Sequence, residues 1–280
     1  MTDYEQLISN LAQLKLNNFS ENYSTEVDQQ RLSFGEALLK LTESELQYRR
    51  DQEIKKRIQQ AKFPIVKGID EFDFNFQPSI NKQEILGLKS LSFLNNHQNI
   101  LLVGSPGVGK THLAIGLGLI ACEHGFKTLF INCHDLLLAL RTADSKGTLE
   151  RQMKRYSNYE LLIIDEIGYL PMKPDDANLL FQLVNNRYEQ HSIIITTNVP
   201  LSGWGEILHN PAAAETILDR LVYKSHIIKI AGKSYGLKSA TNHKSPSYTA
   251  IIVHFQIAIS VQFLIALDRL QLILTFTSTV

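Results

Sequence analysis

The segment 104–111, Gly-Ser-Pro-Gly-Val-Gly-Lys-Thr, has the residue types and spacing of a phosphate-binding loop. Its glycines would let backbone N–H groups turn toward phosphate oxygens, and the N-terminus of a following helix would add partial positive charge. The Lys110 ammonium would reach the β- and γ-phosphates of a nucleotide, and the Thr111 hydroxyl would ligate Mg²⁺. We therefore predict an ATP-binding segment that comprises Gly104, Ser105, Pro106, Gly107, Val108, Gly109, Lys110, Thr111 and His112.

Two acidic residues follow the apolar run 161–164. A buried strand would carry Asp165 to its carboxyl end, which is where ligands bind in open α/β sheets. There Asp165 would hold Mg²⁺ through water, and Glu166 would act as the general base that polarises an attacking water. An acid after an apolar strand is often only a loop residue, but its position after a phosphate-binding loop favours a nucleotide hydrolase.

Asn198 and Arg220 are two further candidates for roles in nucleotide hydrolysis, and neither belongs to a phosphate-binding motif. Asn198 follows the apolar run 193–197, and it would orient the hydrolytic water if that strand neighbours the strand with the two acids; otherwise it is a turn residue. Arg220 lies in a helical segment, and it would stabilise charge on the γ-phosphate if it entered a neighbouring subunit's site. Its alternative is a surface ion pair with Asp219 or Glu215.

Apolar runs alternate with helical patterns through the middle of the chain. The runs that indicate buried strands are 99–103, 128–131, 161–164 and 193–197, with a short fifth run at 227–230. Helical patterns between such runs are typical of a parallel sheet covered on both faces. We therefore predict an α/β fold in which helices flank a P-loop sheet.

The first 62 residues are polar and free of proline, and their leucines recur at helical spacing. No strong helix breaker occurs between Ser33 and Lys62, which predicts one long helix or a broken pair. The dipeptide Phe63-Pro64 should end it, because the residue before a proline avoids helical geometry. Residues 63–79 would form a connector, and 81–94 would form a further helix.

Composition narrows the class of protein. Lys and Arg together number 28, as do Asp and Glu, so the formal net charge of the 280 residues is zero and a wholly basic nucleic-acid binder is excluded. Two cysteines, Cys122 and Cys133, exclude a disulfide scaffold and a four-cysteine zinc site. The N-terminus has neither a basic stretch nor a long apolar run, so we expect no secretory signal and a cytoplasmic protein.

These segments together resemble the IstB family of insertion-sequence ATP-binding proteins, which is related to the DnaC helicase loader within the AAA+ class. The resemblance runs from the N-terminal helices to about Leu237. It rests on the phosphate-binding loop and, around it in order, on the segments 61–64, 72–78, 161–171, 180–183, 196–198, 204–206, 217–221 and 225–235.

The resemblance implies an AAA+ ATPase that forms a homo-oligomer on DNA and helps a partner transposase to use target DNA. It also implies that Asn198 is a sensor residue, that Arg220 is an arginine finger, and that the N-terminal helices contact DNA or a partner. The alternatives are a DnaC-like helicase loader, a small-molecule kinase, and a non-catalytic DNA-binding scaffold gated by ATP. Glu166 next to Asp165 argues against a kinase, and the pairing of Lys110 with Glu166 argues against a scaffold.

A cluster of cations lies toward the end of the predicted long helix: Arg49, Arg50, Lys55, Lys56, Arg57 and Lys62. The ordinary interpretation of such a run is a solvated helix face. In a DNA-dependent ATPase, contact with DNA phosphates is the better interpretation. The sequence shows no helix-turn-helix or zinc-finger signature, so binding should be directed at the backbone and weakly sequence-selective.

The last 42 residues, 239–280, carry only three charges, and Gly236 stands where members of the family usually have arginine. We expect a helical N-terminal domain (1–64), an AAA+ ATPase domain (65–238) and an atypical hydrophobic tail (239–280). The tail is interpreted as the product of a shifted reading frame, with a membrane anchor or a genuine structural element as alternatives. Polar residues interrupt the uncharged run 250–267, so we do not expect membrane contact.

Overall fold

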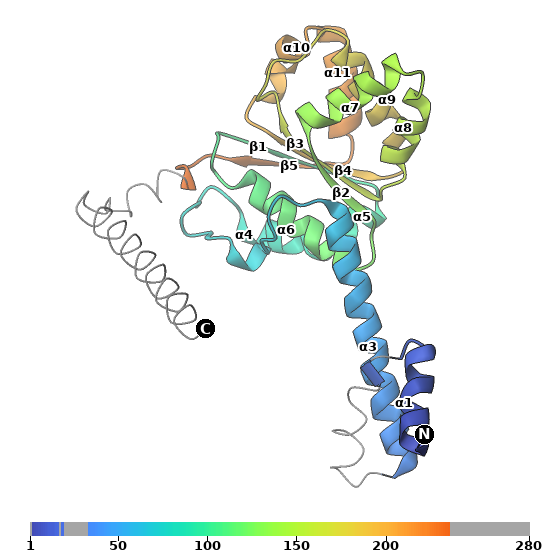
Figure 1. Ribbon diagram of the computed structural model, residues 1–280. Helices are drawn as coiled ribbons and strands as arrows, with labels where there is room; N and C mark the ends of the chain where they lie inside the picture. Colours follow the sequence, from blue (N-terminus) through green and yellow to red (C-terminus); the bar gives the residue numbers. More distant parts are fainter. Residues whose placement is uncertain (1, 17, 20–32, 236–280) are drawn as a thin grey trace, which may run out of the picture. The chain divides into compact units, whose positions relative to one another are not determined.

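The computed structural model describes residues 2–16, 18–19 and 33–235 (Figure 1). The expectations for Gly236 and for the tail 239–280 therefore lie outside the described residues. All elements given below belong to one compact unit, Met1–Gly232. Within the part of the chain that the structure describes, no helix is both long enough and apolar enough to cross a bilayer.

A five-stranded sheet forms the centre of this unit, and every pairing in it is parallel. The strand order is β2-β3-β4-β1-β5, from β1 (Asn99–Gly104), β2 (Thr128–Asn132), β3 (Leu161–Ile167), β4 (Ser192–Thr197) and β5 (Ser225–Ile230). The predicted α/β fold with a P-loop sheet is confirmed. The edge strand β5 alternates in burial, whereas β4 is buried along its whole length, as expected for a central strand covered on both faces.

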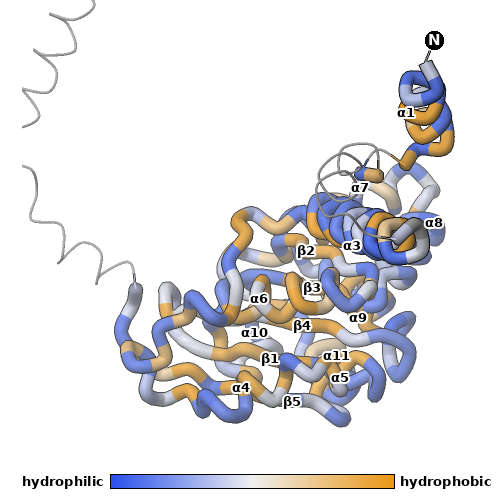
Figure 2. Tube along the Cα trace, turned by 90° about the horizontal axis from the view of Figure 1, so that it is seen from below, coloured by the Kyte–Doolittle hydropathy of each residue, from blue (hydrophilic) through white to orange (hydrophobic). Residues whose placement is uncertain are grey.

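Helices cover both faces of the sheet (Figure 1). One layer contains α6 (Lys110–Glu123). The opposite layer contains α7 (Cys133–Ser145), α8 (Leu149–Ser157), α9 (Asp176–Arg187), α10 (Trp204–Ile207) and α11 (Pro211–Val222). In Figure 2 the strands are mainly orange, whereas α8 and the long N-terminal helix carry extended blue stretches, so the apolar residues gather between the layers.

Helix α6 is apolar nearly all round because it is enclosed between the sheet and the connector that precedes the sheet. Two glycines permit this close packing. A Cβ atom on Gly116 would lie 2.5 Å from Ile69 Cγ1, and one on Gly118 would lie 2.7 Å from Ile163 Cδ1 and 2.8 Å from Phe63 Cε1. The helix that follows the phosphate-binding loop is thereby fixed on both sides.

The N-terminal region contains α1 (Asp3–Gln13) and one unbroken helix, α3 (Phe34–Ala61). A capping box begins α3, since Ser33 Oγ accepts the N–H of Glu36 and Glu36 Oε2 accepts the N–H of Ser33. The helix ends at Lys62, which adopts a left-handed conformation with φ of 60°, just before Phe63-Pro64. The C-terminal end of α3 packs against α6 and β2.

The expectation of one helix over 81–94 was wrong. The structure has two helices, α4 (Lys82–Leu88) and α5 (Ser92–Asn95), separated by Leu91 with φ of 57°. Ser90 causes part of this break, because its hydroxyl donates to Gly87 O and accepts the N–H of Ser92, and such local bonds compete with helical ones. Burial of the Leu91 side chain holds the resulting turn.

Candidate active site

The phosphate-binding loop connects the end of β1 to the start of α6, which is the context predicted for it. Gly107 and Gly109 have φ of 77° and 99°, a left-handed backbone region that favours glycine. Gly104 is needed for another reason, because a Cβ atom there would collide with Ile230 O of the adjacent strand β5. The loop therefore has the backbone that would place N–H groups around phosphate oxygens.

Lys110 is nearly buried at the first turn of α6. Its Nζ atom donates to Gly104 O at 2.7 Å and to Ser105 O at 2.8 Å, which holds the ammonium over the loop. Burial lowers the pKa of Lys110, and the carboxylates of Asp165 and Glu166 act in the opposite direction. An anionic phosphate would stabilise the charged ammonium in this position.

Thr111 and Asp165 lie together, as predicted. Thr111 Oγ1 donates to Asp165 Oδ1 at 3.0 Å, and Thr196 Oγ1 of the neighbouring strand β4 donates to the same oxygen. Burial raises the pKa of Asp165, while the two hydroxyl groups and Lys110 act in the opposite direction. A hydroxyl oxygen and a carboxylate at the mouth of a phosphate-binding loop are the hard oxygen donors that Mg²⁺ prefers, so these residues fit that ion.

Glu166 occupies an irregular position in β3. Ile164 pairs with Ile195 but Ile167 pairs with Thr197, so β3 has one residue more than β4 in this interval, which is a β-bulge. Glu166 accordingly has φ of 63°, unusual for a residue other than glycine. The bulge places a carboxylate at the edge of the sheet next to Asp165.

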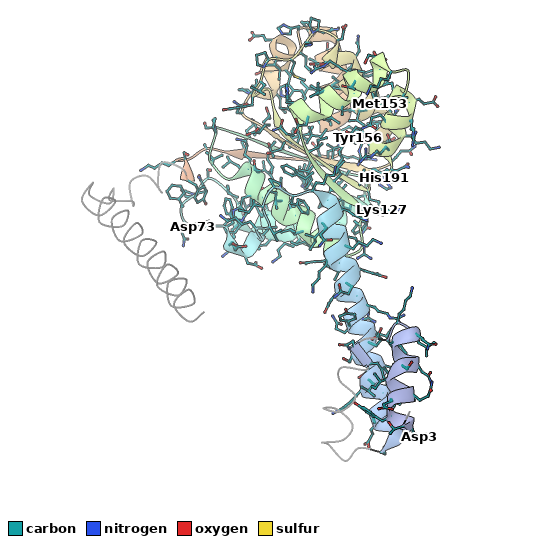
Figure 3. All side chains as sticks on the ribbon, in the orientation of Figure 1. Asp3, Asp73, Lys127, Met153, Tyr156 and His191 are labelled. Carbon is teal, nitrogen blue, oxygen red and sulfur yellow. The ribbon has the colours of Figure 1, made fainter. Side chains whose placement is uncertain are left out.

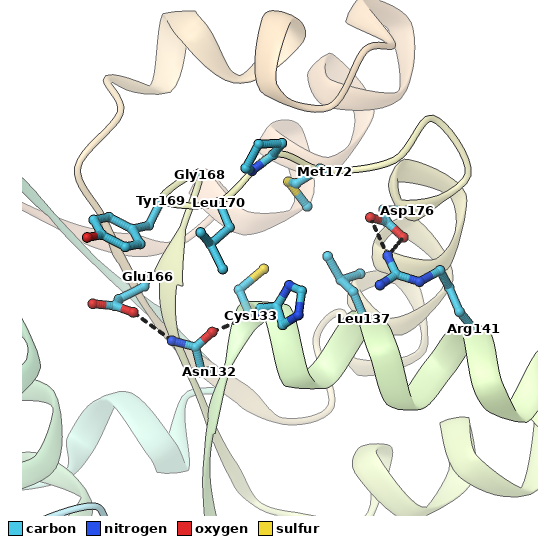
Figure 4. Close-up of a pocket in the computed structure, with 12 residues that line it drawn as sticks. Asn132, Cys133, Leu137, Arg141, Glu166, Gly168, Tyr169, Leu170, Met172 and Asp176 are labelled. Atoms are coloured by element: carbon cyan, nitrogen blue, oxygen red, sulfur yellow. Dashed lines mark hydrogen bonds and ion pairs between the residues drawn. The ribbon is translucent and has the colours of Figure 1, made fainter.

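Asn132 at the end of β2 was not among the predicted site residues. Its Nδ2 atom donates to Glu166 Oε2 at 2.7 Å (Figure 4). The bond ties the Glu166 carboxylate toward β2, which pairs with β3 on the side away from β4 and β1. A usable signal was present in the sequence, because Asn132 directly follows an apolar run, as Asp165 does.

A small cavity beside Glu166 has a volume of about 20 Å³, close to the space that one water molecule needs (Figure 4). An ion pair fixes its outer wall, since Arg141 Nη1 on α7 lies 2.6 Å from Oδ1 of the buried Asp176 on α9. Asp176 Oδ2 also accepts the N–H of Lys173 at 2.7 Å. The loop that follows the catalytic candidate is therefore anchored to α7, while Tyr169 within it remains exposed.

Two other predicted site residues, Asn198 and His112, have different surroundings: Asn198 follows strand β4, and His112 contacts the connector that precedes the sheet. Asn198 follows β4, and β4 neighbours β3, so the condition set for its role is met. Its Oδ1 atom is buried and has no hydrogen-bond partner among the described residues. The His112 ring instead contacts the connector, because Nε2 lies 2.8 Å from Gly68 O and the ring centroid lies 5.4 Å from that of Phe72.

Arg220 lies on α11 against α9. Its Nε atom donates to Asn185 Oδ1 at 3.1 Å, and its guanidinium carbon lies 5.0 Å from the centroid of the Phe181 ring and 6.0 Å from that of Tyr188. Among the described residues Arg220 forms no ion pair, so it does not make the contacts with neighbouring acids that were its alternative.

The predicted DNA-binding cations do not share one environment. Arg49 is paired with Glu45 at 2.7 Å, and Arg50, Lys55 and Lys56 are exposed. Arg57 Nη1 donates to Cys122 O near the end of α6 at 3.4 Å. Of the cluster, Arg57 and Lys62 line a groove on the unit's surface, together with residues of the sheet and α8.

The matching family model and two similar proteins are all described as ATP-binding proteins. A family model described as IstB-like ATP binding protein matches residues 9–243. The ATP-binding protein of insertion sequence IS232 from Bacillus thuringiensis subsp. berliner is 46% identical over 238 residues, which is 84% of this chain and 95% of the relative. The ATP-binding protein of insertion sequence IS21 from Pseudomonas aeruginosa is 40% identical over 238 residues, 85% of this chain and 90% of the relative.

Among solved structures, the crystal structure of DnaI superposes with a TM-score of 0.51 at 17% identity, over 59% of this chain and 91% of that chain. This likeness concerns the fold alone.

Proposed function

The chain belongs to the family of IstB-like ATP-binding proteins, and from this membership we propose that it is a DNA-dependent AAA+ ATPase that assists a partner transposase. It would act in the cytoplasm as a homo-oligomer on target DNA, with weak sequence selectivity. The observation that supports hydrolysis most directly is the convergence of Lys110, the Thr111–Asp165 pair and Glu166 at one edge of the sheet.

The reaction would be the hydrolysis of ATP to ADP and phosphate. Lys110 would bind the β- and γ-phosphates, and Thr111 and Asp165 would hold Mg²⁺, which neutralises phosphate charge when bound. Glu166 would accept a proton from the attacking water at its carboxylate, after release from Asn132. The Asn198 amide would orient the water or the γ-phosphate from the end of β4.

Arg220 would complete the site of a neighbouring subunit, where its charge would stabilise the transferring phosphoryl group. Stacking on Phe181 and Tyr188 would hold its guanidinium in place on the helix surface before assembly. Arg220→Ala protein should bind ATP normally but hydrolyse it poorly. Mixing it with Lys110→Ala protein should restore part of the activity, and no recovery at any mixing ratio with a normal oligomer would count against this role.

Steady-state ATP turnover with and without duplex DNA tests the main proposal. The parental protein should hydrolyse ATP faster with DNA, and Glu166→Gln should keep ATP binding but lower turnover by about 10²–10⁴-fold. Glu206→Gln removes an exposed carboxylate elsewhere and should leave turnover unchanged. If the Glu166→Gln protein hydrolysed ATP at the parental rate, Glu166 would not be the general base. If the parental protein did not hydrolyse ATP at all, an ATP-gated scaffold would be favoured.

A further inference from the structure

An open groove of about 730 Å³ lies where the C-terminal end of α3 meets the start of β2 and helix α8. We call it the basic groove, because its described lining includes six cations and no acidic side chain: Arg57, Lys62, Lys127, Arg151, Lys154 and Arg155. In Figure 3, Lys127 lies beside the upper end of α3, and Met153 and Tyr156 mark α8 above it. Three elements distant in sequence thus contribute charge of one sign to one groove.

Most of this charge is not neutralised by the part of the chain that the structure describes. Within that part, only Arg57 of the six forms an ion pair, with Glu53 at 3.2 Å. The nearby Glu160 carboxylate accepts the backbone N–H of Lys127 at 2.9 Å and leaves the Lys127 ammonium without a described carboxylate. Because the chain as a whole is neutral, six cations in one groove are an uneven distribution that a bound polyanion would offset.

Helix stability alone does not explain the groove. Lys154 and Arg155 lie in the last turn of α8, where cations favour any helix through its dipole. Lys62 and Lys127 belong to other elements, and they face the same groove. The charge therefore gathers across elements and not only at one helix end.

Helix α8 is held so that its cations face outward. Met153 and Tyr156 are buried in the core, while Arg151, Lys154 and Arg155 are exposed at the i, i+3, i+4 spacing of one helix face. The four steps from residue 151 to residue 155 advance about 6 Å along a helix axis. Arg151, Lys154 and Arg155 therefore present three positive charges within about one helical turn, a local charge density that suits a polyanion.

We infer that the basic groove binds the phosphodiester backbone of DNA. The inference rests on the proposed function as a DNA-dependent ATPase and deepens it, since it adds Lys127, Arg151, Lys154 and Arg155 to the DNA contact expected of α3. The groove lies at the amino end of β2, whereas the active site lies at the carboxyl ends of the strands, so ATP and DNA do not compete for space. Duplex and single-stranded DNA share the required chemistry, and the test below distinguishes them.

The test uses the full chain and a triple variant, Arg151→Ala/Lys154→Ala/Arg155→Ala. A matched control, Lys173→Ala/Lys224→Ala/Lys229→Ala, removes the same charge from exposed positions outside the groove. Dissociation constants are measured for a labelled duplex and a labelled single strand across a salt series. If each of the three cations binds one phosphate, the log–log salt slope of the triple variant should flatten by about 2.7 for a duplex, or by about 2.1 for a single strand. The control should keep the parental slope.

The outcomes separate this inference from the proposed function. ATP affinity and melting temperature show whether the triple variant is folded. If it is not folded, the single variant Lys127→Gln replaces it, and the duplex salt slope should then flatten by about 0.9. A slope that flattens for only one of the two DNA forms identifies that form as the ligand of the groove. If the parental chain binds DNA but the groove variants keep the parental slope for both forms, or if the control loses as much as they do, the groove is not a DNA site and the ATPase proposal stands. If the parental chain binds no DNA in either form, both fall.

Discussion

At the scale of single residues, the hydrogen bond from Asn132 to Glu166 controls the position of the proposed base. A hydrogen bond to a charged acceptor contributes about 1.5–3 kcal/mol, and it draws the carboxylate toward β2 and away from the β1 side of the sheet. In the proposed reaction this bond would break before Glu166 accepts a proton from the water at the γ-phosphate.

Asn132→Ala should therefore raise ATP turnover in the absence of DNA, by about 10-fold for each 1.4 kcal/mol of the bond. Turnover with DNA should change less if DNA binding already releases Glu166 from Asn132, as we propose. The measurement is steady-state hydrolysis with and without duplex, with Asn186→Ala as an exposed asparagine control outside the basic groove. A fall in turnover under both conditions would mean that Asn132 positions the base for catalysis.

The buried Asp165 carboxylate should lower the stability of the folded chain at neutral pH. Burial raises its pKa above the ordinary 3.8, so the folded state holds this proton more tightly than the unfolded state. Stability from this group is therefore lost as pH rises through the folded-state pKa and is regained as pH falls toward 3.8.

Asp165→Asn should raise the melting temperature at pH 7 by a few degrees while weakening Mg²⁺-dependent ATP binding. The gain over the parental protein should shrink as pH falls through the folded-state pKa of Asp165, where the parental carboxyl becomes neutral. Scanning calorimetry at several pH values, with Asp175→Asn as an exposed control, measures this. A variant that melts below the parental protein at pH 7 would contradict it.

The sequence patterns could place the main residues of the candidate site together, because each motif is local and follows an apolar run. Lys110, Thr111 and Asp165 lie together as the pattern indicates. Asn132 was missed because its role depends on which strand pairs with β3, and strand order is not visible in a one-dimensional pattern. The contacts of Arg220 with two aromatic rings likewise depend on how α9 and α11 pack.

At the scale of elements, Arg187 fastens α8 and the strands beside it. The Arg187 side chain is fully buried, and it donates to Tyr156 O, Tyr159 O and Ser192 O at 2.7 Å each. These carbonyls belong to the end of α8, to the turn before β3 and to the start of β4. A single guanidinium thus joins the helix of the basic groove to the central sheet.

Arg187→Met should lower the free energy of unfolding by at least about 3 kcal/mol, since it removes three short bonds from a charged donor and leaves their acceptors buried. Arg187→Lys should lose less, because the ammonium can still serve some of these carbonyls. Urea titration followed by circular dichroism measures both variants. A Met variant as stable as the parental protein would show that packing, and not hydrogen bonding, holds this junction.

The elements themselves were largely predictable. All five strands occur where apolar runs indicated them, because a strand covered on both faces needs an uninterrupted apolar sequence. The break between α4 and α5 was not predicted, because the local hydrogen bonds of Ser90 cause only part of it and burial of Leu91 in the folded chain holds the left-handed turn.

At the scale of the whole molecule, the residues proposed for ATP binding all lie in the unit Met1–Gly232, and the family match ends at residue 243. Removal of residues 239–280 should therefore leave ATP affinity within about twofold of the full chain. Isothermal titration of both proteins with ATP and Mg²⁺ measures the effect, and Lys110→Ala serves as the control for lost binding. A truncated protein that no longer binds ATP would show that those residues support the nucleotide site.

Helix α6 begins at Lys110 in the phosphate-binding loop, and its carbonyl at Cys122 accepts a bond from Arg57 of the basic groove. One rigid body therefore touches both proposed ligand sites. If duplex DNA draws Arg57 from that carbonyl and thereby changes ATP affinity by some factor, reciprocity requires ATP to change DNA affinity by the same factor. The two titrations must close one thermodynamic cycle, whichever ligand binds first.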